Sequence, residues 1–321
     1  MLKGKHLIIA TKCFAKENRF LSWYYTLSTF IILLLALICT MAPIFFLFRL
    51  LISVFAGLVT VRLFVIYHDY LHESILQKSK VADLLFAVIG MYVLAPKTVW
   101  KRTHDYHHKH NSKFYKLSIG SYPVYTKNKF QNCTKRERFN YLFIRHPLTI
   151  AFGYIFTFMY GMCINPLMNG FKKHIDSFFA LVFHFLGQFC IVYFLGWETL
   201  LFFCVIPNIV SGAIGSYLFY VQHNFPEVYF SNDQEWTYEA SALESSSHLV
   251  VGSFLNWMTG NIGYHHIHHL NSKIPFYNLP NVMSHFKELQ NPKTITLTIR
   301  DIVACFKLKV WDVEKKKMTT I

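Results

Sequence analysis

The sequence predicts an all-α integral membrane protein with four transmembrane helices in two hairpins and a helical cap on the cytoplasmic side. Three observations support this fold class. The 321 residues are 53% hydrophobic and 18% aromatic. Two apolar blocks are each about twice the length of a bilayer span of ~20 residues. Nearly all positive charges lie outside these blocks. We expect residues 1–321 to form a single domain.

The first apolar block, at about 23–67, is expected to form the first helical hairpin, with its turn near Pro43–Arg49. The second block, at about 177–221, is expected to form the second hairpin, with its turn in the sequence LGWE at 195–198. Cytoplasmic segments at 68–176 and 222–321 follow the two hairpins. The shorter apolar patches at 84–96 and 148–162 are too short to span, so we expect them in the membrane interface or beneath the bundle.

The distribution of charge predicts the orientation. The chain has 32 Lys and Arg residues and a formal net charge of +15. All but Arg49 and Arg62 lie before the first block, between the blocks or after the second. The positive-inside rule therefore places these three portions in the cytoplasm. The polar segments carry no signature of a nucleic-acid-binding fold. Anionic membrane lipids and an acidic protein are the expected partners of the basic face.

Histidine clusters are the most informative feature of the sequence. Of the seventeen histidines, many gather where the chain leaves the expected spans or in the cytoplasmic segments. On a helix, residues at i, i+3 and i+4 share a face, so the members of each cluster point the same way. The candidates are His68 and His72, then His104, His107 and His108, then His223, and finally His265, His268 and His269. His110 and His266 sit beside them but off the repeated spacing.

Neutral imidazole is a good ligand for iron, zinc, copper and nickel. Nine imidazoles are too many for one ion, so the pattern favours a dinuclear metal site with open positions. A structural zinc site would use cysteine or close at four ligands, and no cysteine lies within a cluster. An ion path would need polar groups near the middle of the bilayer, where the second block offers His184, Gln188 and Asn208. A redox metal pair beneath a helical bundle indicates dioxygen chemistry on a lipid-soluble substrate.

These motifs resemble those of the membrane fatty acid desaturases. Their three histidine boxes appear in order, as HxxxH at 68–72 and HxxHH at 104–108 and 265–269. The resemblance covers about 25–290. The stretches FYVQHNFPEVYF (219–230) and WMTGNIGYHHIHHLNSKIPFYNL (257–279) are most similar to the bacterial acyl-lipid, delta-12-like branch. Two departures stand out: the first box reads HDYLH, and Phe219 stands where some acyl-CoA desaturases have a water-bridging asparagine.

The resemblance implies a non-haem centre of two iron ions held by the nine histidines. It also implies an enzyme of unsaturated fatty acid biosynthesis that uses O2 and two electrons to remove two hydrogens from a fatty acyl chain. The electrons would come from an external donor, a ferredoxin or a cytochrome b5-like protein. We expect no nucleic-acid partner. The alternatives are a fatty acyl or carotenoid hydroxylase or ketolase, or an acetylenase, on the same scaffold, and more remotely a membrane metal transporter.

Residues around the boxes are predicted to support the site. Carboxylates commonly orient metal-binding imidazoles through the second ring nitrogen. The candidates for that role are Asp69, Asp105, Glu227, Glu239 and Glu244. Lys101 and Arg102, just ahead of the second box, are candidates for contact with a lipid headgroup.

Overall fold

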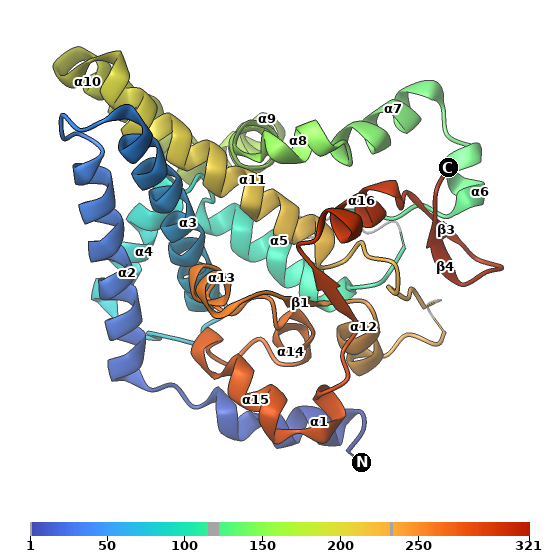
Figure 1. Cartoon of the computed structure of the whole chain (residues 1–321). Coiled ribbons are helices and arrows are strands. Elements are labelled where there is room, and N and C mark those ends of the chain that lie inside the picture. Colours follow the sequence, from blue (N-terminus) through green and yellow to red (C-terminus); the bar gives the residue numbers. More distant parts are fainter. Residues whose placement is uncertain (1, 115–121, 232–233) are drawn as a thin grey trace.

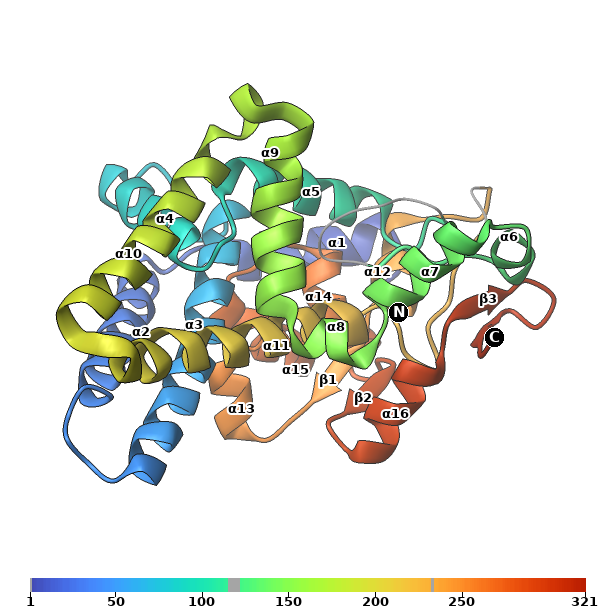
Figure 2. The ribbon, with the colours of Figure 1, turned by 90° about the horizontal axis from the view of Figure 1, so that it is seen from above.

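The protein is mostly helical, and a computed structural model describes residues 2–114, 122–231 and 234–321 (Figure 1). From above, α2, α3, α4 and α10 lie at one side, and α6, α7 and the β3–β4 hairpin lie at the other (Figure 2). The helices are α1 Lys5–Ala10, η1 Thr11–Ala15, α2 Arg19–Cys39, α3 Phe46–Leu71, α4 Lys80–Tyr92, α5 Lys97–His110, α6 Lys127–Gln131, α7 Lys135–Ile144, α8 Pro147–Ala151, η2 Tyr154–Ile164, α9 Asn165–Gly170, η3 Phe171–His174, α10 Ile175–Leu200, η4 Leu201–Val205, α11 Ile206–Val221, α12 Tyr238–Glu244, α13 Ser253–Met258, α14 His265–Leu270, η5 Phe276–Asn278, α15 Leu279–His285, η6 Lys287–Leu289 and α16 Ile299–Lys307.

Helices α2 and α3 occupy the first apolar block and pack against each other. The Asn18 side chain caps α2 by accepting a hydrogen bond from the Leu21 N–H at 3.1 Å, which satisfies an otherwise free donor. Residues 40–45, which include Pro43, separate the two helices. The break overlaps the predicted turn near Pro43–Arg49, but the later part of that range, from Phe46, already belongs to α3.

Helices α10 and α11 occupy the second apolar block. Gly196 interrupts α10 with a φ of 83°, a conformation open to glycine, inside the predicted LGWE turn. Helix α11 packs closely on α3, because a Cβ added at Gly57 would lie 2.7 Å from the Cβ of Val210. Near the N-terminal end of α3, the buried Arg49 forms an ion pair with Glu198 of α10.

Three helical stretches are long and apolar enough to cross a membrane: α2, α3 and the series of helices over Tyr154–Val221, which is kinked at Gly196. A fourth arises if α4 and α5, which meet at 88°, are taken as one bent span. The predicted patch at 148–162 is thus not a separate element, because its second half continues into α9 and α10. Pro166 does not end this run, since it lies in the first turn of α9, where its missing N–H costs no helical bond.

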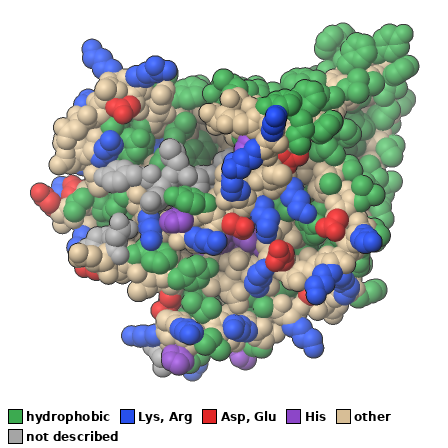
Figure 3. Space-filling model, turned by 180° about the vertical axis from the view of Figure 1, so that it is seen from behind, with side chains coloured by type: hydrophobic (Ala, Val, Ile, Leu, Met, Phe, Trp, Pro, Cys, Tyr) green, Lys and Arg blue, Asp and Glu red, His purple; other side chains and the backbone are tan. Residues whose placement is uncertain are grey.

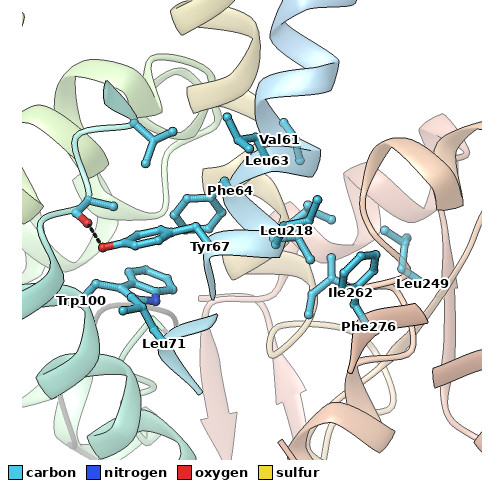
Figure 4. Packing of buried hydrophobic residues seen from close by; sticks show 14 of the residues in the cluster. Val61, Leu63, Phe64, Tyr67, Leu71, Trp100, Leu218, Leu249, Ile262 and Phe276 are labelled. Atoms are coloured by element: carbon cyan, nitrogen blue, oxygen red, sulfur yellow. Dashed lines mark hydrogen bonds between the residues drawn. The ribbon is translucent and has the colours of Figure 1, made fainter. Parts of the chain in front are cut away.

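Two small sheets organise the part of the chain after α11. Strands β1 (His248–Val250) and β2 (Thr294–Thr296) pair in parallel, and β3 (Val310–Asp312) and β4 (Lys317–Thr319) pair antiparallel. The core lies where α3 meets this region. Figure 4 shows Phe64 and Tyr67 of α3 beside Trp100 on one side, and Leu218, Ile262 and Phe276 on the other. Helix α3 therefore joins the long apolar helices to the histidine-bearing segments.

Candidate metal centre

The first histidine box sits at the C-terminal end of α3, where lysines hold the helix end. The ammonium groups of Lys101 and Lys273 donate hydrogen bonds to the carbonyls of Leu71 and His72, at 3.0 and 2.8 Å. Cations are favourable at the negative end of the helix dipole. The carboxylate of Glu73, which follows the first box, lies 3.5 Å from the ammonium of Lys101, ahead of the second box. It also lies 3.1 Å from the ammonium of Lys273, which follows the third box. One carboxylate therefore links residues next to all three boxes.

The histidines of the other boxes are buried on two further helices. The second occupies α5, the third occupies α14, and His223 follows the end of α11. Helix α14 begins where the His268 N–H donates to the Tyr264 carbonyl at 3.1 Å. The β1–β2 pairing and the 2.9 Å bond from the Leu249 N–H to the Gly263 carbonyl hold the chain just ahead of this helix.

The nine predicted histidines come together in two groups. In each group, one nitrogen from every residue lies within 4.8 Å of the others. The first group contains His68, His72, His104, His108 and His268, and the second contains His107, His223, His265 and His269. Among the described residues, these are the groups of side chains that can hold a metal ion.

The rings present their Nε2 atoms to one another. The Nε2–Nε2 distances are 2.8 Å for His68–His104, 3.1 Å for His104–His108 and 3.1 Å for His108–His268. In the second group they are 3.1 Å for His107–His269, 3.1 Å for His265–His269 and 3.0 Å for His223–His265. Ligand nitrogens about 2.1 Å from one metal lie about 3.0 Å apart at right angles and about 3.4 Å apart in a tetrahedron. The spacing therefore fits metal coordination.

Burial disfavours the charged form of imidazole. None of the nine side chains is more than 7% exposed. Desolvation, then the neighbouring rings, holds the pKa of His265, His268 and His269 well below the usual histidine value. Desolvation likewise lowers the pKa of His223 to about 4. Metals bind the neutral form of imidazole, so the site is ready for a metal at neutral pH.

Two ligand candidates have a defined contact through Nδ1. His68 Nδ1 lies 3.2 Å from a carboxylate oxygen of Asp69, whose other oxygen accepts the Phe276 N–H at 2.6 Å. His223 Nδ1 lies 2.9 Å from the main-chain carbonyl of Ser245. Each contact has the ring donate through Nδ1, which leaves Nε2 free to bind a metal.

Among the five carboxylates named from the sequence, Asp69 is the one that the structure brings to an imidazole. Asp105 faces outward and lies 3.8 Å from Lys101, Glu227 is exposed, and Glu244 pairs with Lys293 at 2.7 Å. Glu239 accepts a hydrogen bond from the Gly4 N–H. Each of these four carboxylates lies where solvent, a lysine or the N-terminal segment can reach it, and the role predicted for them stays a prediction.

The remaining candidates have other contacts. Lys101 caps α3 as described, and Arg102 lies 3.1 Å from His174 Nε2. Nδ1 of His110 lies 2.9 Å from the Tyr106 carbonyl, and His266 turns toward the ring of His248, with centroids 5.7 Å apart. Neither histidine belongs to a metal-binding group. Phe219 stacks on Trp100, with ring centroids 5.4 Å apart.

Sequence analysis gave no role to Trp100 or Ser245. Trp100 is fully buried, and its ring stacks on His104 with centroids 4.6 Å apart and planes 16° apart. Its position four residues before His104 on the same helix was the available signal. Ser245 acts through its main-chain carbonyl, which every residue has, so no sequence signal marked it.

Comparison with known proteins agrees with this geometry. The family model described as fatty acid desaturase matches residues 44–298. The chain belongs to the fatty acid desaturase family. Its members are oxidoreductases, and membership implies a fatty acyl lipid substrate.

Individual desaturases are similar over most of the chain. A fatty acid desaturase of Bacillus subtilis is 32% identical over 267 residues, which cover 83% of this chain and 75% of the relative. The sn-1 oleoyl-lipid 12-desaturase of Synechocystis is 23% identical over 74% of this chain and 68% of the relative. A chloroplastic omega-6 fatty acid desaturase of Arabidopsis thaliana is 27% identical over 67% of this chain and 48% of the relative.

Proposed function

We propose that this desaturase is a membrane-bound, di-iron enzyme of the acyl-lipid type that introduces a double bond into a fatty acyl chain with O2 and two electrons. The observation that carries the proposal is the pair of buried histidine groups, which offer nine inward-facing Nε2 atoms. A pair of irons, when bound, would supply the strong oxidant that an unactivated methylene group requires. The all-imidazole donor set, with no cysteine among the ligands, suits iron.

The protein's own residues would orient the ligands and exclude water. Asp69 and the Ser245 carbonyl fix two rings through Nδ1, and Trp100 holds His104 by stacking. The low exposure of the nine rings keeps solvent from the reacting position. Each of these groups would position a ligand and would not react itself.

A cavity of about 450 Å³ provides room for an acyl chain. It lies between α3, α8, α11, α13 and α16, and its walls are almost entirely apolar, with Val61, Tyr217, Leu218, Leu249 and Phe306 among them. Leu218 lies five residues before His223 and packs near Ile262, three residues before the third box (Figure 4). The cavity is thus next to the layer of side chains that covers the histidines.

In this proposal the chain crosses the membrane several times, with the metal centre on the cytoplasmic face. The apolar stretches α2, α3 and Tyr154–Val221 support the first part, and the positive charge outside the apolar blocks supports the second. Figure 3 shows Lys and Arg side chains spread across a face of the molecule beside an apolar region. Such a face would attract an acidic electron donor, a ferredoxin or a cytochrome b5-like protein.

The alternative functions have weaker support. A hydroxylase or ketolase would share the scaffold, so the product separates it from a desaturase. A metal transporter would need metal ligands along the spans. The polar groups there bind one another: Gln188 Nε2 lies 2.6 Å from His184 Nε2 and 3.2 Å from the Tyr154 hydroxyl.

The test is expression in a host with a suitable electron donor, followed by gas chromatography–mass spectrometry of the lipids with double-bond location. We expect a new double bond and about two irons per purified chain. His268→Ala should lose both the product and part of the metal while remaining in the membrane. His6→Ala, which changes an exposed histidine in α1, is the matched control and should behave like the unchanged chain.

New hydroxy or keto products in place of alkenes would move the assignment to the oxygenases on this scaffold. Full turnover in His268→Ala would remove that residue from the ligands.

A further inference from the structure

Helix α13 lies beside the middle of a membrane-spanning helix. Its residue Trp257 accepts a hydrogen bond from the buried Arg62 of α3 through its main-chain carbonyl, and the guanidinium lies 4.3 Å from the Trp257 ring. Arg62 is nine residues before the end of α3, which is about 13 Å along the helix axis. Helix α13 therefore sits well toward the bilayer from the end of α3 that carries the first histidine box.

Helix α16 packs beside the C-terminal end of α11. The Tyr220 hydroxyl donates to the Cys305 carbonyl at 3.2 Å, and the rings of Tyr217 and Phe306 are 5.9 Å apart. These tyrosines belong to the last two turns of the α11 span. The inner side of α16 is thus attached to a helix that the proposed topology places in the membrane.

The outer sides of both helices are apolar where a soluble protein would be polar. Ile299 is 81% exposed, Phe254 is 60% exposed and Leu148 of α8 is 61% exposed. Val303 and Leu297 are also exposed. These five residues surround the elements that line the 450 Å³ cavity, to which Leu255 and Leu297 contribute directly. We call them the rim.

The charges beside the rim are positive. Arg300 and Lys307 are exposed on α16, whereas the carboxylate of Asp301 accepts the Thr296 N–H at 3.1 Å and caps the local turn. A basic amphipathic helix with exposed isoleucine and valine is suited to the boundary between headgroups and acyl chains. Arg300 and Lys307 would lie level with lipid phosphates there.

We propose that α13 and α16 insert their rim into the membrane interface, and that the acyl chain of a bilayer glycerophospholipid enters the cavity sideways between them. The proposal rests on the acyl-lipid function above and adds the route and the lipid class. The substrate reaches the cavity from within its own leaflet, with its phosphate at Arg300 and Lys307, and never passes through water.

The test uses the purified full chain in phospholipid nanodiscs, without an electron donor, so that labelling does not depend on turnover. The probe is phosphatidylcholine with a photoreactive diazirine on its acyl chain, and adducts are located by mass spectrometry. We expect adducts on residues 249–259 and on Phe306, in addition to the outer faces of α2 and α10. Ala213→Phe, which places a ring in the cavity, should remove the cavity adducts and keep those on α2 and α10.

Two matched surface variants test whether entry of the acyl chain depends on the rim or on any exposed apolar residue. Ile299→Glu should reduce the cavity adducts by about tenfold, because a carboxylate disfavours seating α16 among acyl chains. Val313→Glu changes another exposed apolar residue, in the turn after β3, and should leave the adducts unchanged. Equal labelling in both variants would overturn the proposal.

The proposal is also overturned if the phospholipid probe labels only α2 and α10, or if an acyl-CoA probe of the same chain labels the cavity and the phospholipid does not. Cavity labelling in the nanodiscs, together with no desaturated product in the expression experiment, would uphold this route and count against the proposed function. New double bonds without cavity labelling would do the reverse.

Discussion

Replacement of Asp69 by asparagine should weaken metal binding while the chain stays folded. The Asp69 carboxylate accepts two hydrogen bonds, from His68 Nδ1 at 3.2 Å and from the Phe276 N–H at 2.6 Å. Asparagine has the same shape, but only one side of its amide accepts hydrogen bonds. One of the two N–H donors must then face an NH2 group.

The size of the effect follows from burial. Asp69 is 1% exposed, so water cannot replace the lost acceptor. A hydrogen bond to a charged group contributes about 1.5–3 kcal/mol, and a loss of about 2 kcal/mol corresponds to roughly a 30-fold weaker metal affinity. This lies within the about 10- to 100-fold effect typical of residues that orient a metal ligand.

The assay is metal retention in detergent against increasing chelator concentration, with thermal melting to check the fold. Asp105→Asn is the matched control, because Asp105 also directly follows the first histidine of a box. Its side chain is 41% exposed and lies 3.8 Å from Lys101. An exposed ion pair of this kind contributes at most about 1 kcal/mol, so metal affinity should change little.

Equal metal loss in the two variants, or full retention in Asp69→Asn, would refute the claim that Asp69 orients His68. A melting temperature that falls while the metal affinity of the folded fraction is unchanged would show a purely structural role.

Three further predictions follow from the same structure. Acid should destabilise the metal-free protein, because the pKa of His223 is about 4 in the folded chain against 6.5 in the unfolded chain. The free energy of unfolding that this residue contributes is fully present above pH 6.5 and falls by about 3 kcal/mol as the pH drops to 4. A denaturation profile that does not change with pH would contradict this. Gly212→Ala should lower the melting temperature, since its Cβ would lie 2.4 Å from the Tyr154 nitrogen, whereas Gly187→Ala, with open space around it, should be neutral or stabilising. Trp100→Leu should cost about 2–4 kcal/mol and loosen His104, measured by melting and metal retention, with the 74%-exposed Trp197→Leu as a control that changes neither.

The histidine groups could be predicted because their geometry is mostly local. Spacings of three and four residues place rings on one side of a helix whatever surrounds it. Helices α5 and α14, which carry the second and third boxes, preserve this spacing. What remained was to bring four segments together, and the expected location of all four on one face of the membrane predicted that they meet.

The carboxylate contacts could not be predicted in the same way. Asp69 and Asp105 occupy the same position in their boxes, one residue after the first histidine. What distinguishes them is the chain that covers them: the Phe276 segment packs over Asp69, and Lys101 and solvent meet Asp105. That difference depends on contacts across about 200 residues of sequence, which no local pattern encodes.

The extent of helix between the two apolar blocks was also underestimated. The apolar patch at 148–162 was expected to lie in the membrane interface or beneath the bundle. Its second half belongs to the helical stretch over Tyr154–Val221, because the polar residues that follow, including Asn165 and Lys172, fall within helical turns on either side of a non-helical Gly170. Composition marks apolar spans well, whereas the continuity of a helix through a polar stretch depends on its packing.

The arrangement of the two histidine groups has a consequence for biosynthesis. Under the proposed ligand assignment, His68, His72, His104 and His108 of the first group leave the ribosome before any residue of the second except His107. At about 5–20 residues per second, His268 follows His108 by roughly 8–30 s. Until His223 is made within that interval, the nascent chain carries four imidazoles for one site and a single imidazole for the other. Four ligands satisfy zinc, so the growing chain is most exposed to capture of the wrong metal at the first group, before the third box arrives to complete either site.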